Sequence, residues 1–227
     1  MEENIAAKKI AVICYHKNAD IIYPKEWIDK FRESILSQTH QDFDIIELNY
    51  GSPEGKLGKA FRIFENSTFF AYNFSSFISA MNPLIYYCKC NNYDYIFNTN
   101  CDDYYSLDRI EKQLVYLENG YDMVSSNFTL IDENDNHILQ HEFDILDLKT
   151  ELKNNHNIIA HPAAAFNISF FNENKYNEHE IPYEDLKLWQ RAISNGSKIK
   201  IIKDNLLFHR VHSKSVSNSN NDRNQII

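Results

Sequence analysis

The sequence has few glycines and prolines, five of each in 227 residues, and it has no apolar run long enough to cross a membrane. A membrane-spanning helix takes about 20 consecutive apolar residues. The N-terminus also has no basic start followed by an apolar segment of the kind that directs secretion. We therefore expect a cytoplasmic protein without a membrane span.

Basic residues are in the minority, and zinc-type cysteine pairs are missing. The 32 acidic and 23 basic residues give a formal net charge of -9, which disfavours nonspecific binding of nucleic acid. Among the four cysteines, the one close pair is Cys88 and Cys90, and no second pair follows at zinc spacing. Nucleic acid is therefore not expected as a partner, and the cysteines are expected to be reduced thiols.

The first half of the chain alternates between strand and helix patterns. Apolar runs at 9–15, 42–49 and 93–98 predict buried strands, and a helix should follow Pro24. Another helix should begin at Asp108, with Glu111 completing a capping box. Such alternation predicts parallel strands whose carboxyl ends, near residues 14–17, 49–54 and 98–105, meet at one edge of a sheet.

The second half indicates added strands and a late helix. Residues 122–132 and 137–143 predict a hairpin, a helix should follow Pro182, and 198–203 and 205–212 predict two short strands. His137 and His141 have metal-ligand spacing only on a helix, and the strand pattern speaks against one. The sequence thus predicts a three-layer α/β domain over 1–212, with a mixed, mostly parallel sheet flanked by helices. Residues 213–227 predict a polar, mobile tail.

Two pairs of adjacent acids have more than one interpretation. Asp102 and Asp103 follow a strand, so they are either a solvated turn or a cation site. Glu184 and Asp185 begin a helix, where acids are stabilised by the helix dipole whether or not they take part in catalysis. The residue types alone leave both questions open.

The order of motifs resembles the family 2 glycosyltransferases, inverting enzymes with the GT-A fold that use nucleotide-sugar donors. The segment "AVICYHK" is similar to the opening strand of that family, "SILSQTHQDFDIIELNYGS" to its second strand, and "YIFNTNCDDYYSLDRIEKQLVYL" to its Asp-x-Asp-Asp strand end and helix. Later, "HPAAAF", "PYEDLKLWQRAISNG" and "LLFHRVHSKSVS" resemble the acceptor-side loop, the Glu-Asp helix and the closing segment. The resemblance covers roughly residues 8 to 217 in the same order.

The resemblance implies a role for each candidate site residue. Asp102 and His212 would hold a divalent metal, Mn²⁺ or Mg²⁺, that stabilises the leaving nucleoside diphosphate. Asp185 would be the general base for the acceptor hydroxyl, with Glu184 as its neighbour. The nucleotide would lie against four residues at the strand ends, namely Cys14, Tyr15, Asn49 and Asn100.

This chain departs from the family pattern at two of these positions. Asn49 and Asn100 stand where the family usually has aspartates, so two donor-side carboxylates are missing. An amide can still hydrogen-bond a base or a ribose hydroxyl, but cation binding should weaken, and Asn100→Asp should tighten Mn²⁺ binding. His212 could instead be an ordinary exposed histidine, and His161 is as compatible with a structural role as with acceptor binding.

We consider three functions for a protein with these residues. The first is an inverting glycosyltransferase with a nucleotide-sugar donor, most simply a UDP-sugar, and a glycan, protein or small-molecule acceptor. The second, motivated by Asn49 and Asn100, is a catalytically inactive nucleotide-sugar-binding or protein-interaction module of the same fold. A receiver-like phosphoacceptor domain would be shorter and would not contain the "PYEDLKLWQRA" and "HRVH" segments.

Overall fold

The computed structural model describes residues 8–51, 60–143 and 145–213. Its strands are β1 (Ile10–His16), β2 (Asp44–Asn49), β3 (Thr68–Ala71), β4 (Tyr95–Thr99), β5 (Tyr104–Tyr105), β6 (Met123–Ile131), β7 (His137–His141), β8 (Ala165–Asn167) and β9 (Ile199–Arg210). Its α-helices are α1 (Ala19–Ile22), α2 (Lys25–Leu36), α3 (Phe77–Cys90), α4 (Arg109–Glu118), α5 (Ile145–Lys153) and α6 (Glu184–Ser194). Short 3-10 helices cover His161–Ala163, Ile168–Asn172 and Glu178–Glu180.

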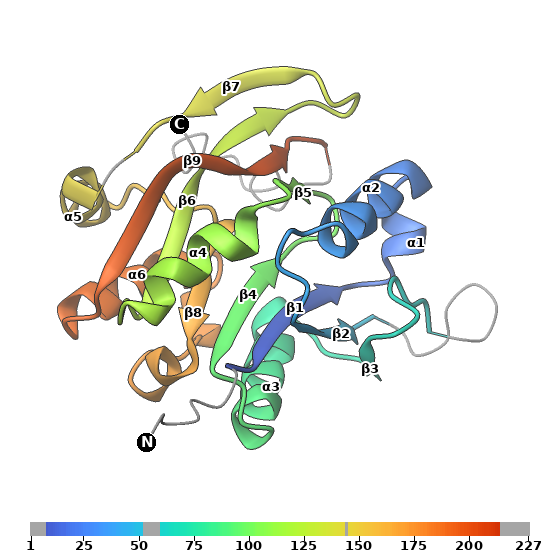
Figure 1. Cartoon of the computed structure of the whole chain (residues 1–227), viewed down its shortest axis with the longest axis horizontal. Helices are drawn as coiled ribbons and strands as arrows, with labels where there is room; N and C mark the ends of the chain where they lie inside the picture. The colour runs from blue at the N-terminus through green and yellow to red at the C-terminus, as the bar shows by residue number, and fades with distance from the viewer. Residues whose placement is uncertain (1–7, 52–59, 144, 214–227) are drawn as a thin grey trace, which may run out of the picture.

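The strands form one mixed sheet in the order β3-β2-β1-β4-β8-β6-β9-β5, with β7 paired to β6 (Figure 1). Strands β3, β2, β1 and β4 are parallel to one another, β8 is antiparallel to both β4 and β6, and β9 is parallel to β6. Strands β6 and β9 therefore run in the same direction as β1, β2 and β4. Their carboxyl ends share one edge, as the sequence predicts for the first three strands.

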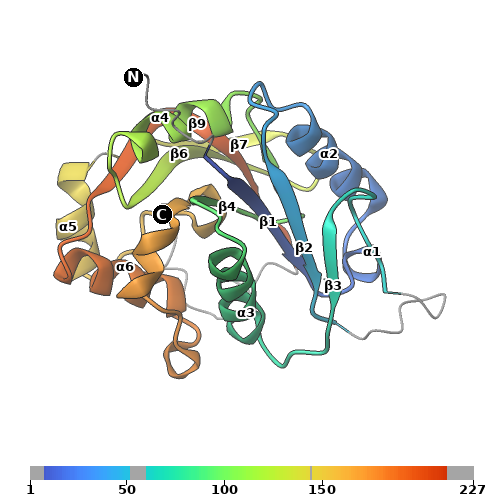
Figure 2. The same ribbon diagram turned by 60° about the horizontal axis from the view of Figure 1, so that its bottom comes forward.

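Helices cover the sheet on both faces, which confirms the predicted three-layer arrangement (Figure 2). Helices α2 and α4 pack on one face, and α3, α5 and α6 pack on the other. Strand β1 supplies alternate side chains to each core: Val12 belongs to the α2 and α4 side, and Ile13 to the α3 and α6 side. A strand buried on both faces needs a continuous apolar run, and "IAVICYH" provides one.

Three local predictions need correction. Helix α4 does begin after Asp108, but Asp108 makes no capping bond; its carboxylate accepts from Ser106 Oγ at 2.6 Å and pairs with Lys112. Glu111 accepts instead from Thr39 Oγ1. The two short strands expected at the C-terminus are the single strand β9, in which the polar residues 203–205 form an irregularity opposite Asn127. Helix α5 and strand β8 were not predicted.

Other sequence-based predictions agree with the structure or lie outside it. His137 and His141 lie on strand β7, so they do not have the helical geometry of a metal pair. The expected C-terminal tail lies outside the described residues apart from Ser213, and so does the end of the segment 49–54. Within the described ranges, no helix is both long and apolar enough to span a bilayer.

Candidate active site

The Asp102 carboxylate lies against the His212 imidazole where β4 and β9 end. Asp102 Oδ2 is 3.0 Å from His212 Nε2, and the two side chains are 15% and 1% exposed. The residues are 110 positions apart, and they meet because β4 and β9 run in the same direction to the same sheet edge. The structure thus brings together the two residues that the sequence predicts as metal ligands.

Aromatic rings enclose His212. The rings of Tyr23 and Trp27 lie 5.7 and 5.1 Å from the His212 ring, and the Arg210 guanidinium lies 4.5 Å from the Trp27 ring centre. His212 as a whole is buried. The alternative of an ordinary exposed histidine is therefore wrong.

Asp103, next to Asp102, has a structural role. Its side chain is fully buried and accepts hydrogen bonds from His209 Nδ1 at 3.1 Å and from the Arg210 backbone N–H at 2.8 Å. The Arg210 guanidinium donates to the Asp102 carbonyl at 2.9 Å. Burial raises the pKa of Asp103 against the opposing effect of His209. Burial lowers the pKa of His209, but the charge and hydrogen bond of Asp103, together with the charge of Asp102, raise it overall. The end of β9 thus holds the Asp102 turn in place from two sides.

Tyr15 connects the ends of β1 and β4. Its hydroxyl donates to Asn100 Oδ1 at 2.7 Å and lies 3.2 Å from His161 Nδ1. The other nitrogen of His161, Nε2, is 2.6 Å from the Tyr176 hydroxyl and 3.1 Å from Asn98 Nδ2. A continuous chain of hydrogen bonds therefore runs from the donor-side Asn100 to Tyr176, more than 70 residues later.

The other two predicted nucleotide contacts, Cys14 and Asn49, lie deeper. Cys14 is fully buried inside the sheet, and burial raises the pKa of its thiol well above the usual value. Asn49 is 1% exposed, and its amide is used within the chain: Oδ1 accepts from the backbone N–H groups of Asn18 and Gly51, and Nδ2 donates to the Phe61 carbonyl. Asn49 thus shapes the turn after β2.

Asp185 begins α6 as a half-buried carboxylate with uncharged partners. Its Oδ2 accepts from Asn157 Nδ2 at 2.8 Å, and its Oδ1 accepts from the Leu186 backbone N–H at 2.7 Å. Burial, and to a lesser degree the charge of Glu184, raises the pKa of Asp185 to about 6. A carboxylate with that pKa is ionised at neutral pH yet can accept a proton, which is what a general base requires.

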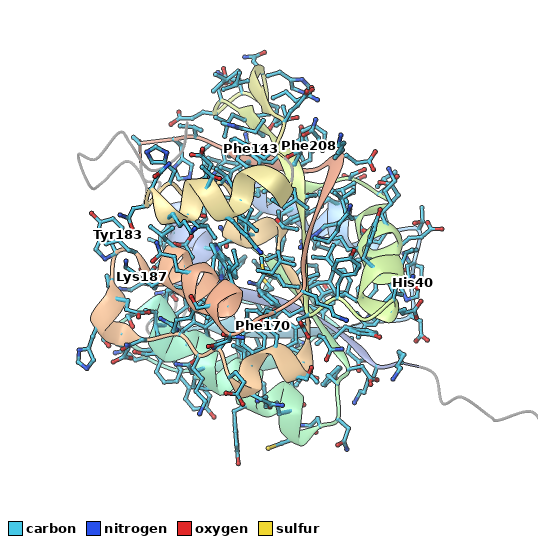
Figure 3. The ribbon with its side chains drawn as sticks, turned by 90° about the vertical axis from the view of Figure 1, so that its left-hand side faces the viewer. His40, Phe143, Phe170, Tyr183, Lys187 and Phe208 are labelled. Atoms are coloured by element: carbon cyan, nitrogen blue, oxygen red, sulfur yellow. The ribbon has the colours of Figure 1, made fainter. Side chains whose placement is uncertain are left out.

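Glu184 precedes Asp185 in the first turn of α6. In the sequence, Tyr183 lies directly before this acidic pair and Lys187 two residues after it. Figure 3 shows the side chains of both at this end of α6. Burial raises the pKa of Glu184, and within the described ranges its Oε2 atom is buried and has no hydrogen-bond partner. Glu184 therefore adds negative charge next to Asp185 without sharing its hydrogen bonds.

Tyr176 ends the hydrogen-bond chain that starts at Asn100, and sequence reasoning missed it. Burial, together with the charges of Asp185 and Glu184, raises the pKa of the Tyr176 hydroxyl, so this hydroxyl lies within electrostatic reach of both acids. The same hydroxyl contacts His161. Tyr176 stands in an irregular polar segment, so no periodicity marked it in the sequence.

Glu47 was missed although the sequence carried a signal, a charge inside the apolar run "DIIELN". Its buried carboxylate lies 3.1 Å from His16 Nε2 and accepts from the Phe64 backbone N–H at 3.1 Å and from Ser67 Oγ at 2.8 Å. These bonds tie the segment before β3 to β2. Glu47 therefore supports the sheet edge on which the site is built.

With this geometry in place, comparison with known proteins identifies the family. The sequence pattern described as Glycosyl transferase family 2 matches residues 10–175, well over half of the chain. The chain belongs to glycosyl transferase family 2. The predicted family, and with it the enzyme class, are confirmed.

Two curated relatives of this family member are glycosyltransferases by name. The O-antigen biosynthesis glycosyltransferase WbnJ of Escherichia coli is 25% identical over 201 residues, which cover 86% of this chain and 78% of WbnJ. The uncharacterized glycosyltransferase MJ1057 of Methanocaldococcus jannaschii is 26% identical over 202 residues, which cover 84% and 68% of the two chains.

The solved structure of another protein has the same fold as this chain. The crystal structure of Staphylococcus aureus TarS 1-349 in complex with UDP-GlcNAc superposes with a TM-score of 0.66 at 14% identity. The match covers 91% of this chain, which spans about 60% of the TarS chain. The predicted GT-A-like fold is therefore confirmed.

Asp102 and His212 are compatible with a cation that has few protein ligands. No group of three or more His, Cys, Asp or Glu side chains suited to a metal occurs within 8–51, 60–143 and 145–213. Asp102 and His212 supply one carboxylate and one imidazole side by side. Mg²⁺ is commonly bound through one or two carboxylates, with water and substrate phosphates as further ligands, so such a pair is compatible with a cation that arrives with a diphosphate.

Proposed function

We propose that this family 2 member is an inverting glycosyltransferase that moves a sugar from a UDP-sugar to an acceptor hydroxyl with the help of a divalent metal. The observation that supports it most is the contact between the predicted metal ligands Asp102 and His212 at the sheet edge. A hydrogen-bond chain also runs from Asn100, two residues before Asp102, through Tyr15 and His161 to Tyr176, whose pKa is raised by burial and, to a lesser degree, by the charge of the predicted base Asp185. The UDP-GlcNAc complex of TarS supports the choice of donor.

On the donor side, Asp102 and His212 would hold Mn²⁺ or Mg²⁺ next to the diphosphate. When bound, the cation would offset the negative charge that develops on the leaving nucleoside diphosphate. The protein contributes the fixed position of the Asp102 turn, because Arg210 holds its backbone and Asp103 is locked to β9. A preorganised turn needs no rearrangement when the donor binds.

On the acceptor side, Asp185 would accept the proton of the attacking hydroxyl. The acceptor oxygen forms a bond to the anomeric carbon while the bond from that carbon to the phosphate oxygen breaks, and UDP leaves with the electron pair. The proton ends on the Asp185 carboxylate, whose pKa of about 6 suits this transfer. Attack from the face opposite the leaving group inverts the anomeric configuration.

The acceptor itself would be a glycan, a protein or a small molecule bound near Glu184 and Asp185. Nucleic acid is not proposed as a partner, because the net charge of -9 opposes its nonspecific binding. The cytoplasmic location expected from the sequence stays a prediction.

Donor binding and turnover test the proposal together. The purified protein should bind UDP in calorimetry, bind it more tightly with Mn²⁺, and release UDP from a UDP-sugar by transfer or slow hydrolysis. UDP binding without turnover, and without an effect of Mn²⁺, would select the inactive module instead. Absence of both binding and turnover with any nucleotide sugar would reject the glycosyltransferase proposal.

A further inference from the structure

Asn100 presents one end of its side-chain amide to the protein and the other to the site. Its oxygen Oδ1 accepts from the Tyr15 hydroxyl at 2.7 Å, and the side chain is half-buried. The amide nitrogen makes no hydrogen bond within the part of the chain that the structure describes. The position where the family usually has a carboxylate is thus filled by a group with a hydrogen-bond donor still to use.

The direction of the hydrogen bonds around His161 determines which end of the Asn100 amide faces inward. At its Nε2 atom, His161 meets the Asn98 amide nitrogen, which can only donate, and the Tyr176 hydroxyl. With the Asn98 amide in this orientation Nε2 accepts, so the ring proton is on Nδ1 and donates to the Tyr15 oxygen. The Tyr15 proton is then left for Asn100 Oδ1.

The opposite arrangement requires both amides to turn. With the ring proton on Nε2, the Asn98 amide oxygen would have to face His161, and the Tyr15 hydroxyl would donate to His161 Nδ1. The Asn100 amide would then have to present its nitrogen, in place of Oδ1, to the Tyr15 oxygen. Burial also lowers the pKa of His161 to about 3, so the ring stays neutral and keeps one donor and one acceptor.

We propose that Tyr15, oriented by His161, holds the Asn100 amide oxygen inward, so that Asn100 offers its N–H₂ group to an anionic oxygen of the nucleoside diphosphate. Asn100 is then a donor to the substrate and not a weakened metal ligand, because an amide nitrogen has no lone pair available for a cation. His161 is a positioning residue that acts through Tyr15. This inference rests on the proposed function, because it assigns a contact to the same donor.

The proposal changes what Asn100→Asp should do. A carboxylate at this position would add a metal ligand, as the resemblance to the family pattern implies. It would also remove the hydrogen bond from the Asn100 amide to the diphosphate, and its negative charge would repel the diphosphate. Hydrogen bonds to charged groups contribute about 1.5–3 kcal/mol, which corresponds to roughly ten-fold or more in affinity. We therefore expect Asn100→Asp to weaken UDP binding about ten-fold or more in EDTA, with a smaller deficit in Mn²⁺.

The experiment is calorimetric titration of UDP into the full chain, in EDTA and in Mn²⁺. Tyr15→Phe should weaken metal-free UDP binding about three- to ten-fold, because the Asn100 amide is then free to turn. Tyr93→Phe is the matched control: it removes a hydroxyl that donates to Asp44 at 2.7 Å at the opposite edge of the sheet, and UDP binding should not change.

The role of His161 is tested by two replacements. His161→Asn keeps an N–H donor near the position of Nδ1 and should retain wild-type UDP affinity within about two-fold, whereas His161→Leu should match Tyr15→Phe. Adding His161→Leu to Tyr15→Phe should cost nothing further, since both changes break one chain of contacts.

The outcomes separate this inference from the proposed function. If the wild type binds UDP and Asn100→Asp binds it equally well in EDTA, the Asn100 amide points the other way and the inference is overturned. Unchanged UDP affinity in Tyr15→Phe would overturn it as well. A wild type that binds no UDP under either condition would reject the proposed function and this inference with it.

Discussion

Two pairs of adjacent acids look alike in the sequence and differ in the structure. The donor-side pair, Asp102 and Asp103, follows β4, and the acceptor-side pair, Glu184 and Asp185, begins α6. Both carboxylates of the donor-side pair have hydrogen-bond partners on β9 or directly after it, whereas in the acceptor-side pair Asp185 is bound by Asn157 and by the backbone of Leu186. The pairs differ in the charge of those partners.

The donor-side pair is surrounded by imidazoles and a guanidinium. Asp102 contacts His212, Asp103 contacts His209, and Arg210 binds the backbone of the turn. Burial nevertheless raises the pKa of Asp103, and the hydrogen bonds from His209 and the Arg210 backbone oppose that rise. The end of β9 therefore fixes the position of both carboxylates, which suits the binding of a cation and its diphosphate.

The acceptor-side pair has only neutral donors. Asp185 binds the Asn157 amide and a backbone N–H group, and Glu184 adds a like charge. Without a cation, burial dominates and the pKa of Asp185 rises to about 6. The two pairs therefore differ in their partners: donors from one strand end hold the donor-side pair in place, whereas neutral donors leave Asp185 with a pKa suited to proton transfer.

The largest effect should come from Asp185→Asn, which removes the proposed base and leaves the donor site intact. Turnover should fall about 10²- to 10⁴-fold, the usual contribution of general base catalysis. The affinity for UDP, measured by calorimetry, should stay within about two-fold of wild type.

Glu184→Gln is the control for that change, because it removes a neighbouring charge from the same helix turn. It should lower turnover much less than Asp185→Asn. Wild-type turnover in Asp185→Asn would show that the acceptor-side pair does not contain the base.

A second test contrasts the members of the donor-side pair. Asp103→Ala leaves His209 and the Arg210 N–H buried without their partner, and breaking a buried pair in this way costs about 3–5 kcal/mol in the free energy of unfolding. Asp102→Ala, at a partly exposed side chain, should cost clearly less but abolish the effect of Mn²⁺ on UDP binding. Urea unfolding followed by circular dichroism measures the first quantity.

Equal losses of stability in the two alanine variants would contradict this division of roles. So would an Asp102→Ala protein that still binds UDP more tightly with Mn²⁺, because Asp102 is the proposed carboxylate ligand.

A third test uses pH. Turnover at saturating substrate should rise with pH through a midpoint near 6, because Asp185 accepts a proton only when it is ionised. Below that midpoint the carboxyl is already protonated, so turnover should fall about ten-fold per pH unit. A profile that stays flat from about one pH unit below the midpoint to about one unit above it would be inconsistent with Asp185 as the base.

The smallest effects should be shifts of that midpoint in opposite directions. Asn157→Ala removes a hydrogen bond that stabilises the ionised form and should raise the midpoint, whereas Glu184→Gln removes a like charge and should lower it. Each shift should be up to about one pH unit. Shifts in the same direction in the two variants would contradict the hydrogen-bond and charge assignments.

Much of the fold follows from local patterns in the sequence. The apolar run at β1, the apolar residues at helical spacing in α2 and the Asn119-Gly120 end of α4 are each sufficient to predict an element. Strand β8, with three residues, and the short helix α1, with four, are too small for any periodicity to mark them. Packing against neighbouring elements, and not local propensity, defines such short segments.

The site was predictable in part. The sequence indicated Asp102, His212 and Asp185, and the structure places the first two in contact. It could not indicate that the Asn49 amide is used by the turn after β2, or that Tyr176 reaches the site. Hydrogen bonds between residues distant in sequence leave no periodic pattern.

The amino-acid sequence alone indicates the alternating strands and helices of the first half, the family and the acids available for chemistry, because apolar spacing and residue type are local properties. Folding then determines that Asp103 is buried, which partners the four acids have and which end of the Asn100 amide faces the site. These depend on β9 returning to the edge where β4 ends and on His161 reaching Tyr15. Burial and the charge of distant neighbours set the pKa and the hydrogen-bond direction, and both exist only once the chain has folded.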